Sequence, residues 1–215
     1  VLDKTIKEAD TYVQIKENKL HELKKEARKT PPFSVERYNL NNDIYLEYKA
    51  YSSDSALHYL NENMLLARQL NDKERELKIQ LELSYLLSSI GMYMEAADIL
   101  NSIDRQTLPS SLLGHYYTCY EHVYFEAGAA QPRYKMFASR YVKLSHAYRD
   151  SMQITLDPSS ATYLWLRETQ LREAGKYDEA LEFSDRRLAE SSFGTPQYAL
   201  VAYQRFRLFE SMGKK

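Results

Sequence analysis

The sequence has few of the residues that form tight turns or covalent cross-links. Its 215 residues include six glycines, six prolines and a single cysteine, Cys119. Glycine and proline are too few for a β-sandwich or barrel with many tight turns, and no long Val/Ile/Thr-rich alternation indicates strands. One cysteine excludes an intramolecular disulfide and leaves both oxidising and reducing compartments open.

Long hydrophobic runs, an excess of charge of one sign and the common catalytic motifs are also missing. No segment approaches the roughly 18 apolar residues of a membrane-spanning helix. The net charge of −1 gives no overall positive field that would attract nucleic acid or anionic lipid. No phosphate loop, G-x-G-x-x-G, G-x-S-x-G or H-E-x-x-H motif occurs. We therefore expect a binding protein that is not an enzyme and holds no cofactor.

Tyrosine is abundant by contrast, with nineteen copies. Tyrosine rings pack through their apolar body and form hydrogen bonds through their hydroxyl, so they suit both helix contacts and binding surfaces. The hydrophobic share of 44% and the charged share of 27% are close to those of ordinary folded, water-soluble proteins. The composition therefore predicts a folded and largely helical chain.

The spacing of apolar residues predicts ten helices, the first over residues 1–29 and the last ending near Met212. We expect two parts: the long first helix, with its end, over residues 1–30, and a repeat domain over residues 34–215. The residues expected to cap or end later helices are Ser34, Gly91, Ser110, Gly128, Asp157-Pro158 and Thr195-Pro196, and two further helices are expected to begin near Asp72 and at Gln131-Pro132.

A short motif occurs twice, each time between two predicted helices. Residues 91–96 and 175–180 share the pattern G-x-Y-x-E-A. The glycine ends the first helix, the tyrosine fills the corner, and the alanine lets two antiparallel helices approach closely. The structural residues of the motif are Gly91, Tyr93, Ala96, Gly175, Tyr177 and Ala180.

This motif and its spacing resemble the tetratricopeptide repeat family, whose unit is a helix-turn-helix of about 34 residues. Leu83, Leu87, Leu164 and Leu171 match first-helix anchors of that family, Ser84 matches its small residue, and Pro109 lies near its terminal proline. The resemblance implies an all-α fold, a right-handed superhelical stack of antiparallel helix hairpins. Three residues depart from the pattern, since larger side chains replace small ones at Ile103, Glu168 and Arg187.

Four helix pairs follow from this resemblance, over residues 38–70, 72–104, 110–154 and 159–191. The third pair is elongated. The last helix resembles the first half of a fifth pair, and we expect the natural protein to continue beyond Lys215.

A narrower resemblance concerns the first residues. Leu2-Asp3-Lys4-Thr5-Ile6, the segment Tyr12–Leu23 and the tyrosine-rich helices that follow resemble the amino-terminal regions of a group of bacterial regulators. In that group a signal sequence precedes periplasmic repeats, and a membrane helix then leads to a cytoplasmic DNA-binding segment. The resemblance implies a periplasmic location after signal-peptide removal, with a cytoplasmic one as the alternative. Any membrane contact would come through segments outside this sequence.

One helix face carries His115, Cys119 and His122, with Glu126 one turn further on. Such side chains can ligate zinc, but neighbouring positions on one straight helix rarely converge on a single ion. The same stripe also suits a packed face of a repeat, which is the interpretation that we favour. We therefore predict no metal site, and these three residues are the candidate ligands if one exists.

The segment 133–149 mixes cations with aromatic rings, namely Arg133, Lys135, Arg140, Lys143 and Arg149 with Tyr134, Phe137, Tyr141 and Tyr148. That mixture can bind phosphate and stack bases. It also fits an amphipathic helix with solvated cations and core aromatics, and the balanced charge of the chain favours this. We expect no nucleic acid to bind here.

The leading functional hypothesis is a protein- or peptide-binding sensor region, because stacked hairpins leave a curved surface lined by their first helices. The residues proposed for binding are Tyr85, Tyr116, Tyr120, Tyr124 and Tyr163. A structural spacer or a homodimerisation module using residues 1–29 is an alternative. An RNA-binding helical repeat around Arg140 is another.

Overall fold

The structure, a computed structural model, describes residues 9–130 and 133–213 of the chain. These residues form ten helices and no strand, which confirms the all-α prediction. The helices are α2 (Ala9–Lys29), α3 (Val35–Tyr48), α4 (Ser53–Gln69), α5 (Lys73–Ser89), α6 (Tyr93–Ser102), α7 (Ser110–Ala130), α8 (Lys135–Thr155), α9 (Ala161–Glu173), α10 (Tyr177–Ala189) and α11 (Pro196–Ser211).

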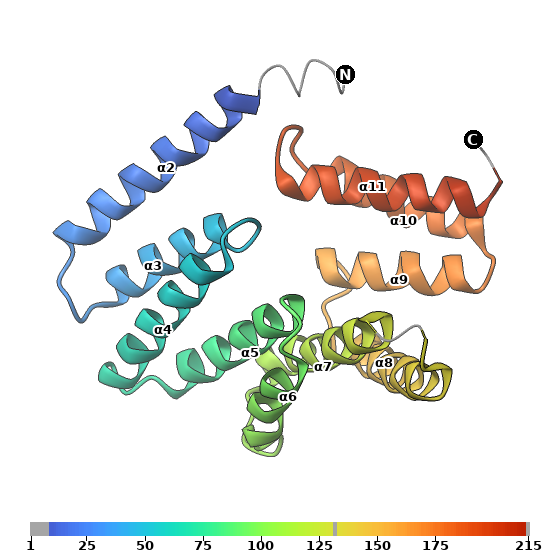
Figure 1. Ribbon diagram of the computed structural model, residues 1–215, viewed down its shortest axis with the longest axis horizontal. Helices are drawn as coiled ribbons and strands as arrows, with labels where there is room; N and C mark the ends of the chain where they lie inside the picture. Colours follow the sequence, from blue (N-terminus) through green and yellow to red (C-terminus); the bar gives the residue numbers. More distant parts are fainter. Residues whose placement is uncertain (1–8, 131–132, 214–215) are drawn as a thin grey trace.

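Consecutive helices form hairpins that stack into a curved solenoid (Figure 1). The pairs are α3–α4, α5–α6, α7–α8 and α9–α10, with α2 packed on α3 at one end and α11 packed on α10 at the other. In Figure 1, α2–α4 lie on one side of α5–α8, and α9–α11 lie on the other side. The third pair is the longest, with 21 residues in each helix, as the sequence predicted.

Two predicted N-caps, Ser34 and Thr195, are confirmed, and Asp72 caps the helix that was expected to begin near it. The side chains of Ser34, Asp72 and Thr195 each accept a hydrogen bond from the backbone N–H three residues further on. Pro196 occupies the first turn of α11, where its missing N–H is not needed. The predicted helix residues 1–8, the helix start at Gln131-Pro132 and the last two lysines lie outside the described residues.

Two predicted helix boundaries were wrong. The prediction that α7 ends at Gly128 fails because α7 continues to Ala130, and Gly128 serves a close helix contact instead. A Cβ there would lie 3.3 Å from the Cβ of Tyr141 on α8. Asp157-Pro158 does not cap α9, whose N-cap is Ser160. Asp157 instead accepts hydrogen bonds from the backbone and hydroxyl of Ser159 in the preceding turn.

The repeated motif has the same structure at both of its copies. Gly91 has φ +89° and Gly175 has φ +74°, the left-handed conformation that glycine adopts without strain at a helix C-terminus. Ala96 and Ala180 are fully buried where the paired helices meet. The hydroxyl of Ser84 on α5 donates to the carbonyl oxygen of Ala96 on α6. The small residues therefore hold the two helices of a pair close together.

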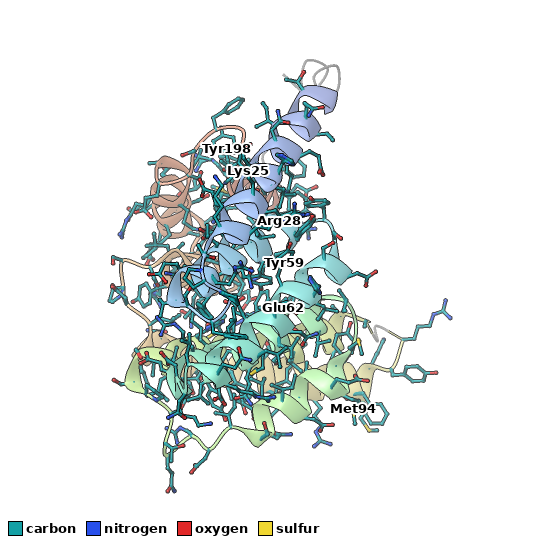
Figure 2. All side chains as sticks on the ribbon, turned by 90° about the vertical axis from the view of Figure 1, so that its left-hand side faces the viewer. Lys25, Arg28, Tyr59, Glu62, Met94 and Tyr198 are labelled. Carbon is teal, nitrogen blue, oxygen red and sulfur yellow. The ribbon has the colours of Figure 1, made fainter. Side chains whose placement is uncertain are left out.

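The hydrophobic core is a series of clusters that follows the solenoid. One cluster contains residues of α5, α6, α7, α8 and α9. A second contains residues of α3, α4 and α5, and a third contains residues of α9, α10 and α11. At the amino-terminal end, Leu20 and Ala27 of α2 pack against Ile44 of α3. Figure 2 views this end, with Lys25 and Arg28 on α2 and Glu62 on α4. Within the described ranges, none of the helices combines the length and the hydrophobicity that a membrane span requires.

Candidate functional site

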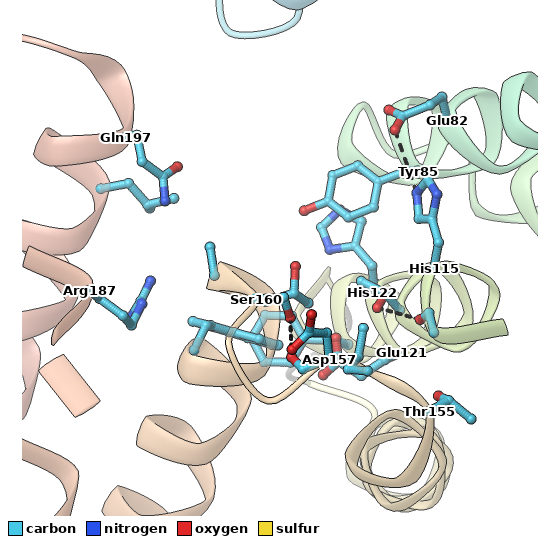
Figure 3. Close-up of a pocket in the computed structure, with 18 of the residues that line it drawn as sticks. Glu82, Tyr85, His115, Glu121, His122, Thr155, Asp157, Ser160, Arg187 and Gln197 are labelled. Carbon is cyan, nitrogen blue, oxygen red and sulfur yellow. Dashed lines mark hydrogen bonds and ion pairs between the residues drawn. The ribbon is translucent and has the colours of Figure 1, made fainter. Parts of the chain in front are cut away.

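A groove of about 790 Å³ lies between α5 and α7 on one side and α10 and α11 on the other, with the start of α9 between them (Figure 3). Side chains from α5, α7, α9 and α11 line it, and these are the first helices of successive pairs. Lys49 just beyond α3, the end of α8, the α8–α9 turn with Asp157, and Arg187 of α10 also contribute to the lining. The groove therefore lies where a helical-repeat solenoid presents its binding surface.

Helix α7 supplies the largest share of the lining, because one of its faces packs in the core and the other faces the groove. Tyr116 and Tyr120 point into the core, where both are buried. The opposite face presents polar and aromatic side chains at spacings of three and four, so that they follow one stripe of the helix. Those lining residues are Ser111, Gly114, His115, Thr118, Glu121, His122, Phe125 and Glu126.

Glu82 of α5 connects three helices beneath the groove. Its carboxylate accepts hydrogen bonds from the Tyr45 hydroxyl at 2.6 Å and from Lys49 Nζ at 3.0 Å, and it lies 3.6 Å from His115 Nε2. Burial alone would raise the pKa of Glu82, but Lys49 and His115 outweigh it and hold that pKa below its ordinary value. Glu82 is therefore an ionised and neutralised part of the groove wall.

The two histidines of the groove are held in the neutral form. The His122 ring stacks on the Tyr85 ring with centroids 4.0 Å apart, and its Nε2 lies 2.9 Å from the Ser89 hydroxyl. Burial, helped by Lys49, lowers the pKa of His122 to about 4. Burial also lowers the pKa of His115, against the opposing effect of Glu82. Neither ring adds positive charge to the groove at neutral pH.

A buried ion pair supports the aromatic part of the groove. Arg149 of α8 donates to Glu121 of α7 at 2.8 Å, and Ser145 donates to the same carboxylate oxygen at 3.0 Å. The Arg149 guanidinium also lies 5.8 Å from the ring centre of Phe125 and 6.0 Å from that of Trp165. These contacts fix the two rings that line the groove between α7 and α9.

The structure places one of the five proposed binding tyrosines in the groove, namely Tyr85. Tyr116 and Tyr120 are buried, and Tyr124 is half-buried and stacks on the core rings of Tyr120 and Tyr148. Tyr163 is half-buried on α9 and does not line the groove. Tyr120 and Tyr124 therefore join α7 to α8 through the Tyr148 ring.

The metal candidate residues diverge in the structure. Cys119 is fully buried, its thiol donates to the Leu81 carbonyl, and burial raises its pKa well above the ordinary value. His115 and His122 make separate contacts with Glu82 and with Tyr85 and Ser89. Throughout residues 9–130 and 133–213, no group of three or more His, Cys, Asp or Glu side chains is placed to hold a metal ion.

The cation-rich segment of α8 divides between surface and core. Met136, Phe137, Arg140 and Lys143 are exposed, whereas Arg149 is buried in its ion pair. The segment lies on the second helix of its pair, away from the groove lining.

Several groove residues were not predicted from the sequence. Glu82, Lys49 and Gln197 belong to no motif, and only the packing of α3, α5 and α11 brings them together. Phe125 and Glu121 had a usable signal, because they lie one helical turn apart on the stripe that contains His115 and His122.

Comparison with known protein families gives a match over nearly the whole chain. The model of the SusR N-terminal TPR domain matches residues 6–215, which includes every helix described above. No curated protein matches the chain.

Proposed function

Because the chain belongs to the SusR N-terminal TPR domain family, we propose that its groove binds an extended protein segment and that the domain is the sensory region of a bacterial transcriptional regulator. Tetratricopeptide repeats form scaffolds for protein interaction, and their stacked first helices make an extended concave surface. The groove along α5, α7, α9 and α11 is the observation that carries the proposal. It combines aromatic rings with fixed polar groups, as ligand sites do.

The regulator role rests on the family and on the resemblance of Leu2–Ile6 and Tyr12–Leu23 to the start of such regulators. In this proposal the domain lies in the periplasm, and its occupancy is passed on by segments outside this sequence. Fractionation of cells that make the full-length protein tests the location. Recovery of the repeat domain in the cytosolic fraction would contradict it.

A groove-filling variant tests binding. Gln197 points into the groove from α11 (Figure 3), so Gln197→Trp adds a bulky ring to the space that a bound segment would occupy. Gln153→Trp is the matched control, because Gln153 is exposed on α8 outside the groove lining. Peptides selected from a random display library on the wild-type domain should lose binding to Gln197→Trp and keep it with Gln153→Trp.

The same pair of variants tests the regulator role in the full-length protein. In native host cells, Gln197→Trp should change a defined set of transcripts that Gln153→Trp leaves at wild-type levels. Unchanged transcripts together with lost peptide binding would leave a binding scaffold without a regulatory role.

One observation favours homodimerisation as a second candidate function. The stripe on α2 that buries Leu20 and Ala27 against α3 continues to Val13, which is 61% exposed. A second copy would cover this apolar end. Sedimentation velocity over a range of concentrations should then show a dimer that Val13→Glu dissociates, and a monomer at all concentrations would exclude it.

A further inference from the structure

The charges that line the groove do not cancel. Lys49 is paired with Glu82, Arg187 is paired with Glu168, and Glu121 is paired with Arg149. Glu126 of α7 and Asp157 of the α8–α9 turn also line the groove, and neither has an ion-pair partner among the described residues. With both histidines neutral, the lining carries two uncompensated carboxylates. The net charge of the whole chain is only −1, so this excess is local.

The two carboxylates lie toward opposite ends of the groove. Thr155 and Leu156, next to Asp157, lie against Gly114 near the start of α7. Glu126 lies about three turns beyond Gly114 on α7, which is roughly 18 Å along the helix axis at the rise of an α-helix. A fully extended chain covers that distance in about five or six residues. One short extended segment can therefore reach both carboxylates.

Aromatic rings share the groove lining with these two carboxylates. Tyr85, Phe125 and Trp165 all line the groove, and Phe125 is 47% exposed. Such rings accept both apolar side chains and cations, since the face of an aromatic ring carries negative potential. Burial and the neighbouring Glu121 raise the pKa of Glu126, so an approaching cation would also stabilise its ionised form.

We propose that the groove selects a cationic extended protein segment, with Lys or Arg side chains near both ends that meet Glu126 and Asp157 while its middle packs on Tyr85, Phe125 and Trp165. The inference rests on the proposed function and specifies the chemistry of the partner. Acidic segments are excluded because they would bring like charge to a groove without a free cation among its described lining residues.

A selection experiment separates this inference from the proposed function. Random seven-residue peptides are displayed and selected on the wild-type domain, and binders that also bind Gln197→Trp are removed. We expect the remaining peptides to be enriched in Lys or Arg at two positions four or five residues apart. Groove-dependent peptides without cationic enrichment would overturn the inference and leave the proposed function standing. A failure to recover any groove-dependent peptide would overturn both.

Two charge-neutral variants then measure the contribution of each carboxylate with the tightest selected peptide. Glu126→Gln and Asp157→Asn each keep an oxygen acceptor and should each weaken binding about tenfold, with a weaker salt dependence. Glu62→Gln, at an exposed acidic residue on α4 (Figure 2), should stay within about twofold of wild type. If both groove variants bind the peptide with unchanged affinity, the inference is overturned. Thermal unfolding of each variant verifies that it is folded.

Discussion

Arg187 of α10 and Glu168 of α9 form a buried ion pair at two of the three positions where the sequence departs from the tetratricopeptide pattern. Arg187 Nη1 lies 2.5 Å from Glu168 Oε2, and both side chains are about 5% exposed. Arg187 Nη2 donates to Gln204 of α11 at 2.6 Å. The two departures therefore compensate each other within one hairpin and also connect that hairpin to the next helix.

Arg187→Ala should destabilise the domain by about 3–5 kcal/mol, because it leaves the Glu168 carboxylate buried without its partner. Urea unfolding followed by circular dichroism measures this free energy.

The double variant Glu168→Ala/Arg187→Ala gives the control for that prediction. It removes both charges and restores small residues of the family type at both positions, so it should be more stable than Arg187→Ala alone. The free energies of unfolding that Glu168→Ala and Arg187→Ala lose as single variants are then compared with the loss of the double variant. If the double variant loses their sum, the pair has no coupling.

The sequence was sufficient for the fold because local and repeated signals agreed. The glycines at 91 and 175 end helices in the same left-handed conformation, and the alanines that follow are buried as predicted. The helix end predicted at Gly128 was wrong because glycine also permits close helix packing inside a helix, and only the position of Tyr141 distinguishes the two uses.

The groove was predicted less completely than the fold. A tyrosine ring suits both a core and a binding surface, so the spacing of Tyr116, Tyr120 and Tyr124 cannot show which face of α7 meets α8. The pairing of Glu168 with Arg187 depends on the register between two helices, which neither residue reveals alone. Glu82 acquires its role from Tyr45, Lys49 and His115, and all three lie far from it in the sequence.

Gly91→Ala should destabilise the domain by about 1 kcal/mol, since a side chain disfavours the left-handed conformation at φ +89°. No atom lies within 4 Å of the added Cβ, so the loss would come from the backbone alone. Gly91→Asn should lose less, because asparagine tolerates this conformation better. Chemical denaturation compares the two, and equal stability of Gly91→Ala and wild type would contradict the expectation.

Cys119 should resist thiol reagents in the folded domain. It is fully buried, donates to the Leu81 carbonyl, and has a pKa raised by burial. Only the thiolate reacts quickly, so modification requires opening of the α5–α7 contact. With an aromatic disulfide reagent at pH 8, labelling should be on the order of a thousandfold slower without urea than in unfolding urea. Rapid stoichiometric labelling of the native protein would place the thiol at the surface.

Stability should fall as the pH is lowered from about 6.5 toward 4, in part because of His122. Burial lowers the pKa of His122 to about 4 in the folded state, whereas the ordinary value is near 6.5. Between these values the unfolded chain binds a proton that the folded chain does not, so protonation favours unfolding. The full effect of this residue is at most about 3 kcal/mol. His115, whose pKa burial also lowers, acts in the same direction.

The variant His122→Phe isolates the contribution of His122, because a phenyl ring can keep the stack on Tyr85 and cannot titrate. Its melting temperature should fall less than that of wild type between pH 6.5 and 5. Glu82 does not interfere in this range, because its depressed pKa makes its contribution disappear only at lower pH. Parallel melting curves for the two proteins would mean that His122 is already protonated or solvated in the folded state, and the stack on Tyr85 would then not exclude water.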